Sequence, residues 1–100
     1  MLDKEYLINL NKEKKFWEIY SIFREEFKEM ILLFFKSNNI TVSDDDSLID
    51  LTTKLKSTNK KYAYVSSLII ESFYSDETTL STALNNCFDI YEELKLALKI

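Results

Sequence analysis

The sequence of 100 residues contains no glycine and no proline. These residues normally supply tight hairpins, β-bulges, sharp turns and the loops that hold phosphate groups. Their absence argues against turn-rich β architectures and excludes the glycine-dependent phosphate and dinucleotide loops. The sequence therefore predicts an all-α chain whose helices are joined by Asn, Ser and Asp residues.

Histidine is also absent, and Cys87 is the single cysteine. This inventory excludes zinc sites with His or Cys ligands, Ser-His-Asp triads, Cys-His pairs and an internal disulfide. Cys87 falls within an apolar stripe of helical spacing, so we expect a small buried hydrophobe there rather than a nucleophile. We expect a protein without enzymatic activity or a cofactor, in the reducing environment of the cytoplasm.

The chain is acidic, with 13 Lys and Arg against 17 Asp and Glu and a net charge of −4, and Arg24 is its only arginine. Nucleic-acid binding is disfavoured, because it usually needs a basic face and arginine forks. Its two lysine clusters are read as solvated helix faces: Lys12, Lys14 and Lys15, and Lys54, Lys56, Lys60 and Lys61. The longest apolar run, Met30 to Phe35, is far short of a membrane span, and the N-terminus is too charged for a signal peptide.

The first half of the chain has the apolar spacing of one long amphipathic helix. We expect it to run from about Lys12, with Asn11 as its cap, to Ser37, and to end at Ser37–Asn39, because asparagine tolerates left-handed backbone angles. Asp3 would cap a leading segment through Leu10, either as a separate short helix or as part of the long one. The apolar residues 30–35 surround the helix, so burial on several sides is expected there.

Three further helices are predicted in the second half. The first covers about residues 45–56, with Ser43 and Asp46 as a capping box, and the next covers about 60–74. Residues 75–79 supply caps for the last helix, whose apolar stripe is Leu80, Leu84, Cys87, Tyr91, Leu94 and Leu98. With connections of about five residues, these elements predict one domain over residues 1–100, an antiparallel four-helix bundle with a short extra N-terminal helix as an option.

An acidic cluster, Asp44, Asp45, Asp46 and Asp50, marks the start of the second predicted helix. Carboxylates there would stabilise the positive end of the helix. They could alternatively bind a divalent cation, although the spacing lacks the alternation, the glycine and the terminal glutamate of an EF-hand. A helix cap and a cation site are therefore both retained as interpretations.

Aromatic side chains with polar edges are favoured at core boundaries and at interaction hot spots. Trp17 lies one step from the main apolar stripe, and Tyr62 and Tyr64 project from different faces of one helix. Together with Tyr20 they form a candidate surface for a protein partner or for a second copy of the chain. Packing at the core boundary is the alternative interpretation.

The order of elements resembles the HEPN superfamily over about residues 12–99, from "FWEIYSIFREEFKEMILLFFKSNNI" through "DSLIDLTTKL" to "YAYVSSLIIESFYSDETTLSTALNNCFDIYEELKLAL". Members of that superfamily are small bundles of four or five helices from prokaryotic defence and toxin-antitoxin systems. Its catalytic members are ribonucleases that carry an arginine and a histidine near the start of the last helix pair. Here there is no histidine, and Arg24 lies in the first long helix, so the resemblance implies a non-catalytic, antitoxin-like or binding member.

Two functions follow from the sequence. The first is a non-enzymatic helical interaction module from a bacterium or phage that buries an aromatic-rich face against a protein. The second is a small acidic immunity or anti-defence protein that neutralises a basic partner. Its carboxylates would be Asp44, Asp45, Asp46, Asp50, Asp76 and Glu77. Salt should weaken the second kind of association much more than the first.

Overall fold

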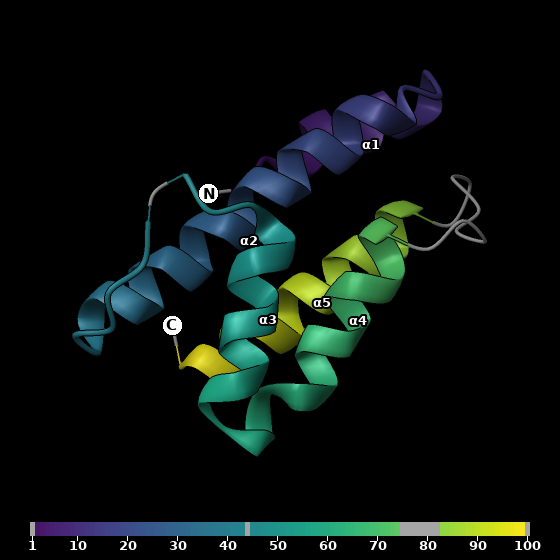
Figure 1. Ribbon diagram of the computed structural model, residues 1–100. Coiled ribbons are helices and arrows are strands. Elements are labelled where there is room, and N and C mark those ends of the chain that lie inside the picture. Colours follow the sequence, from purple (N-terminus) through teal and green to yellow (C-terminus); the bar gives the residue numbers. More distant parts are fainter. Residues whose placement is uncertain (1, 44, 75–82, 100) are drawn as a thin grey trace.

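The computed structural model describes residues 2–43, 45–74 and 83–99. These ranges contain five α-helices, one short 3-10 helix and no strand (Figure 1). The prediction of an all-α bundle with a short extra N-terminal helix is confirmed. The helices are α1 (Lys4–Lys12), α2 (Phe16–Ser37), α3 (Leu48–Thr58), η1 (Lys60–Tyr62), α4 (Ala63–Tyr74) and α5 (Ala83–Leu98).

The N-terminal segment forms a separate helix, α1, with Asp3 at its cap. The Asp3 carboxylate accepts a hydrogen bond from the backbone N–H of Tyr6 at 3.1 Å, which satisfies one of the donors left open at a helix start. Leu7 and Leu10 are buried on one face. Of the two arrangements expected for this segment, the separate helix is therefore the one formed.

The predicted start of the long helix near Lys12 is wrong. Lys12 ends α1, Asn11 lies inside α1 rather than capping α2, and α2 begins only at Phe16. Between the two helices Lys14 has a φ of 59°, in the left-handed region. Because this region normally favours glycine, a lysine there gave no turn signal in the sequence.

The end of α2 follows the prediction. Asn39 has a φ of 58°, and the Asn38 side chain donates a hydrogen bond to the carbonyl oxygen of Phe34 at 2.9 Å. Asparagine therefore replaces glycine as the residue that ends the helix. The expected burial of residues 30–35 on several sides is confirmed, with one exposed position. Leu33 is 56% exposed, whereas Met30, Ile31 and Phe35 are buried.

The start of α3 is displaced from the predicted one. Ser47, not Ser43, is the cap: its Oγ accepts the backbone N–H of Asp50, and the Asp50 carboxylate accepts the backbone N–H of Ser47, both at 3.2 Å. The helix therefore begins at Leu48 instead of residue 45. Ser43 instead forms a turn in which its Oγ accepts the N–H of Asp45 at 3.2 Å.

The third predicted helix, over about 60–74, is confirmed as η1 followed by α4. The Asn59 side chain opens it by accepting the backbone N–H of Lys61 at 3.0 Å. α3 and α4 therefore form an antiparallel pair joined by a tight turn, and α5 returns alongside α4 (Figure 1). The caps expected at residues 75–79, and Leu80, lie outside the described residues, and the structure describes the backbone but not the side chain of Leu84.

α2 and α5 pack against each other and run in the same direction. The rings of Phe23 and Phe88 meet edge to face at 5.2 Å, and those of Phe27 and Tyr91 lie 6.3 Å apart. Since residue numbers rise together along both helices, the pair is parallel, which departs from the antiparallel order predicted for the bundle. The connection over residues 38–47 makes this possible by carrying the chain back along α2 before α3 begins (Figure 1).

The core lies between α2, α3, α4 and α5, and α1 closes one side of it. Phe23, Phe27 and Phe35 from α2 are fully buried, and Leu51 and Leu55 of α3 and Leu94 of α5 are fully buried with them. Cys87 has no exposed surface, so the expectation of a small buried hydrophobe is confirmed. None of the described helices is both long enough and apolar enough to cross a membrane.

Candidate binding site at one end of the bundle

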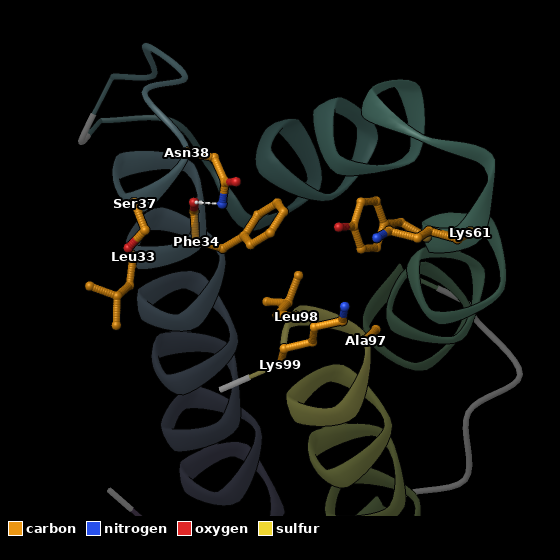
Figure 2. A pocket seen from close by; sticks show the side chains of 9 residues that line it. Leu33, Phe34, Ser37, Asn38, Lys61, Ala97, Leu98 and Lys99 are labelled. Atoms are coloured by element: carbon orange, nitrogen blue, oxygen red, sulfur yellow. Dashed lines mark hydrogen bonds between the residues drawn. The ribbon is translucent and has the colours of Figure 1, made fainter.

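A pocket of about 360 Å³ opens where the last turns of α2 and α5 meet η1 (Figure 2). Elements far apart in the sequence form it. Its lining residues are Leu33, Phe34, Ser37, Asn38, Lys61, Tyr62, Ala97, Leu98 and Lys99. The volume is at the lower end of the range for ligand pockets, and suits one apolar group such as a large side chain.

Two aromatic rings and one aliphatic side chain form the apolar part of the pocket. The Phe34 and Tyr62 rings stand edge to face with their centroids 5.4 Å apart, and Leu98 lines the same pocket. Tyr62 and Leu98 are buried, and Phe34 is half-buried. Leu33, on the rim, is more than half exposed. The Leu33 side chain points away from Phe34 and Leu98 in Figure 2, so Leu33 borders the pocket without facing into it.

Both charged residues that line the pocket are lysines. The ammonium group of Lys61 lies 5.0 Å from the centroid of the Tyr62 ring, a cation–π contact that keeps this charge beside the aromatic wall. Lys99 directly follows α5 with a φ of 58°. Its side chain turns toward the pocket in Figure 2. No carboxylate belongs to the pocket lining, so the local charge is positive.

The whole end of the bundle around the pocket is basic. The segments that converge there are residues 31–43, 53–63 and 94–99, and none of the 17 acidic residues falls within them. They hold seven lysines: Lys36, Lys54, Lys56, Lys60, Lys61, Lys95 and Lys99. The net charge of −4 therefore conceals a strong separation of charge along the molecule.

Helix dipoles do not cancel this positive charge. α2, α3 and α5 end on this side of the bundle, and each helix C-terminus carries only about half a negative charge. The start of α4 lies on the same side, and its half positive charge offsets part of the negative charge from these three helix ends. An anionic group in the pocket would therefore be attracted to Lys61 and Lys99, which line it.

The aromatic residues predicted as one interaction surface separate into two kinds. Trp17 and Tyr64 are 74% and 67% exposed, whereas Tyr20 and Tyr62 are buried. Trp17 and Tyr20 lie on adjacent turns with ring centroids 6.4 Å apart. Phe34, near the end of α2, contacts Tyr62, and Tyr64 follows Tyr62 by two residues at the start of α4. Tyr64 therefore lies near the end of α2, whereas Trp17 lies at its start. The four residues do not form one face, and Tyr62 contributes to the pocket instead.

The predicted acidic residues occupy the connection before α3 and its first turn. Asp45 is exposed, Asp46 is half-buried, and Asp44 lies outside the described residues. Asp50 is used in the capping box with Ser47, with a further 2.8 Å contact between Ser47 Oγ and the Asp50 carboxylate. Within the described ranges, no group of three or more Cys, Asp or Glu side chains is arranged to hold a metal ion.

Burial controls the chemistry of Cys87. Loss of solvent raises the pKa of its thiol from 9.0 to about 12, so the thiolate is scarce at neutral pH. Burial also raises the pKa of Tyr20, with a smaller contribution from the neighbouring Cys87. The pKa of Tyr91 is raised by burial and then by Glu26 and Glu92.

Sequence reasoning missed the pocket and the basic end around it. The lysines at 54–61 were interpreted as a solvated face, and those at 36, 95 and 99 were not connected with them. A usable signal existed, because three segments that each contain a helix end are free of acidic residues. That these segments meet depends on the parallel course of α2 and α5, which the sequence pattern does not specify.

Comparisons with protein family models, with curated proteins and with solved structures gave no match for this chain.

Proposed function

We propose that the protein is a non-enzymatic helical interaction module. It binds a protein partner at the pocket between the last turns of α2 and α5, which we call the open end of the α2–α5 seam, the seam being the contact between these two helices. The observation that carries this proposal is the apolar pocket with the exposed Leu33 on its rim. Leu96, next to Ala97 of the pocket lining, is 75% exposed. Several exposed apolar side chains near one pocket favour an interaction site, whereas single exposed ones are common on any protein.

The chemistry of the side chains supports a binding role over catalysis. The single cysteine is buried with a raised pKa, and the sequence has no histidine for a general base. The compartment that we propose is the cytoplasm, in which an unpaired cysteine is the usual state.

The resemblance to the HEPN superfamily extends the proposal to a non-catalytic defence or toxin-antitoxin component. The bundle of five described α-helices is compatible with the size of those domains. Arg24 is exposed on α2, away from the last pair of helices, which supports a member without the catalytic arginine and histidine. This part of the proposal depends on the resemblance alone.

The acidic-inhibitor alternative has less support in the geometry. It needs a set of carboxylates that face a basic partner, but Asp50 is already bound in the capping box and Asp46 is half-buried. The exposed Leu33 and Leu96 also lie elsewhere, at the basic end. We therefore favour the interaction module.

The test is a tagged pull-down from the native host with nuclease present, washed at low and at high salt. Leu33→Ser combined with Leu96→Ser would be compared with Ile8→Ser combined with Ile49→Ser, which changes exposed apolar residues elsewhere. We expect one stoichiometric protein partner that the first variant loses and the control keeps. Light scattering of the purified chain would identify a second copy as the partner.

Equal recovery of all proteins by both variants would contradict the proposal, as would recovery of the bait alone with a monomer in light scattering. Circular dichroism must show that both variants remain folded. Surface substitutions of this kind usually change stability by less than about 0.5 kcal/mol.

A further inference from the structure

We infer that the pocket binds an acidic polypeptide segment that packs one apolar side chain against the half-buried Phe34 ring, beside Tyr62 and Leu98. This inference rests on the proposed function and specifies the chemistry of the partner. It has two independent supports: the apolar pocket and the separation of charge around it.

Charge complementarity identifies the partner as anionic. Lys61 and Lys99 line the pocket, and five more lysines lie on the segments that converge there without any acidic residue. An acidic segment would approach this end preferentially, because opposite charges steer association and disfavour wrongly charged partners. Within the site, carboxylates on either side of the inserted residue would pair with Lys61 and Lys99.

The pocket itself adds an apolar requirement. Its volume of about 360 Å³ and its aromatic walls accept one large aliphatic or aromatic side chain. Burying such a side chain strengthens binding by about ten- to a hundredfold, more than an exposed lysine–carboxylate pair supplies. The expected ligand therefore has an apolar residue flanked by acidic ones.

Nucleic acid fits these features less well than an acidic polypeptide. Single-stranded nucleic acid binds by stacking bases on open aromatic faces, but Tyr62 is only 4% exposed and its ring meets Phe34 edge to face. The lining also lacks arginine. Beyond this end the chain is acidic, and a long polyanion would be repelled there, whereas a short segment would not reach it.

The experiment titrates the purified protein with fluorescent synthetic peptides and follows anisotropy. The probe is a short peptide of Asp and Glu with one central Leu. The comparison ligands are the same peptide with Ser in place of Leu, a peptide with Lys in place of the acids, and an oligouridylate of equal length. We expect the Leu-containing acidic peptide to bind most tightly and the Ser version to bind about tenfold more weakly.

Two protein variants separate the charge from the pocket. Lys61→Ala with Lys99→Ala should weaken binding of the acidic peptide about tenfold, and Lys12→Ala with Lys28→Ala, which removes the same charge elsewhere, should change it little. Ala97→Leu would fill the pocket and should abolish the difference between the Leu and Ser peptides. Thermal melts would confirm that each variant is folded.

The inference is overturned if the oligouridylate binds more tightly than the acidic peptide, if the two lysine pairs have equal effects, or if Leu and Ser peptides bind alike to the wild-type chain. The absence of any peptide binding overturns it as well. A protein partner found in the pull-down would still support the interaction module after any of these outcomes. Failure of this inference is therefore distinguishable from failure of the proposed function.

Discussion

The seam between α2 and α5 is closed along its middle and open at one end. In the closed part, Phe23 and Phe27 are fully buried against Phe88 and Tyr91. Two turns later on the same helix, Phe34 is half-buried and Leu33 is exposed, and the helices diverge around a pocket (Figure 2). One pair of parallel helices therefore provides both the centre of the core and the proposed binding site.

The difference follows from what covers each part. α1 lies over the closed part, where the Lys4 ammonium group is 5.4 Å from the centroid of the Phe88 ring. At the open end, residues of η1 and the last residues of α5 line the pocket with Phe34, and Lys61 and Lys99 are part of that lining. We therefore expect Phe23, in the closed part, to contribute mainly to stability, and Phe34, at the open end, to contribute mainly to binding.

The largest expected effect is the loss of a phenylalanine from the closed part. Phe23→Ala should lower the free energy of unfolding by about 3–5 kcal/mol, because it removes a fully buried ring and its edge-to-face contact with Phe88. Phe34→Ala should cost only about 1–2 kcal/mol, because that ring is half-buried, but it should weaken binding at the pocket. Urea unfolding followed by circular dichroism measures both. Equal losses of stability in the two variants would show that Phe34 contributes as much to folding as Phe23 does, which contradicts the proposed difference between the two parts.

A smaller effect should come from raising the pH. The folded pKa of Cys87 is about 12 and the unfolded value is 9.0, so the unfolded chain binds fewer protons between these values. The contribution of Cys87 is thus complete below pH 9 and is lost as the pH rises toward 12, with a slope of at most about 1.4 kcal/mol per pH unit. The raised pKa values of Tyr20 and Tyr91 act in the same direction.

The variant Cys87→Ala separates the thiol from the tyrosines. It should be less stable than the wild type at neutral pH. The gap between the two should narrow as the pH approaches about 11, because the thiol of the unfolded wild-type chain then ionises and favours unfolding, whereas the variant has no thiol. Urea unfolding of both chains across this range provides the measurement. A constant gap would mean that Cys87 does not titrate differently in the two states, and that the closed part admits water.

Much of the fold was predictable because the relevant signals are local. The spacing of apolar residues identified α2, α4 and α5, and asparagine ended α2 at the expected place with a left-handed residue at Asn39. The position of the break between α1 and α2 was predicted wrongly because Lys14 adopts the left-handed conformation without being glycine or asparagine. In a chain without glycine, left-handed backbone positions are occupied by other residue types, and most of these do not indicate a turn in the sequence.

The candidate site was much less predictable because it depends on long-range geometry. Tyr62 was selected for its residue type, but its burial next to Phe34 follows from where η1 packs. Leu98 was assigned to a core stripe, and it is buried, yet it also lines the pocket. The pattern of one helix does not show where its neighbour ends.

The smallest predicted effect concerns the start of α3, at the opposite end of that helix from the pocket. The sequence contains two serines followed three residues later by aspartate, Ser43 with Asp46 and Ser47 with Asp50, and only the second pair forms the capping box. Ser47→Ala should therefore cost about 1 kcal/mol of stability. Ser43→Ala removes only a hydrogen bond in an exposed turn and should cost less than about 0.5 kcal/mol.

Peptide affinity at the pocket should be unchanged in both serine variants, because the cap fixes the beginning of α3 and the pocket forms beyond its end. Thermal melts and the anisotropy titration would be run on the same preparations. A larger loss of stability from Ser43→Ala than from Ser47→Ala would restore the earlier helix start. A loss of peptide affinity in a folded Ser47→Ala variant would instead show that the open end depends on α3 along its whole length, so that the two parts of the molecule are not energetically separate.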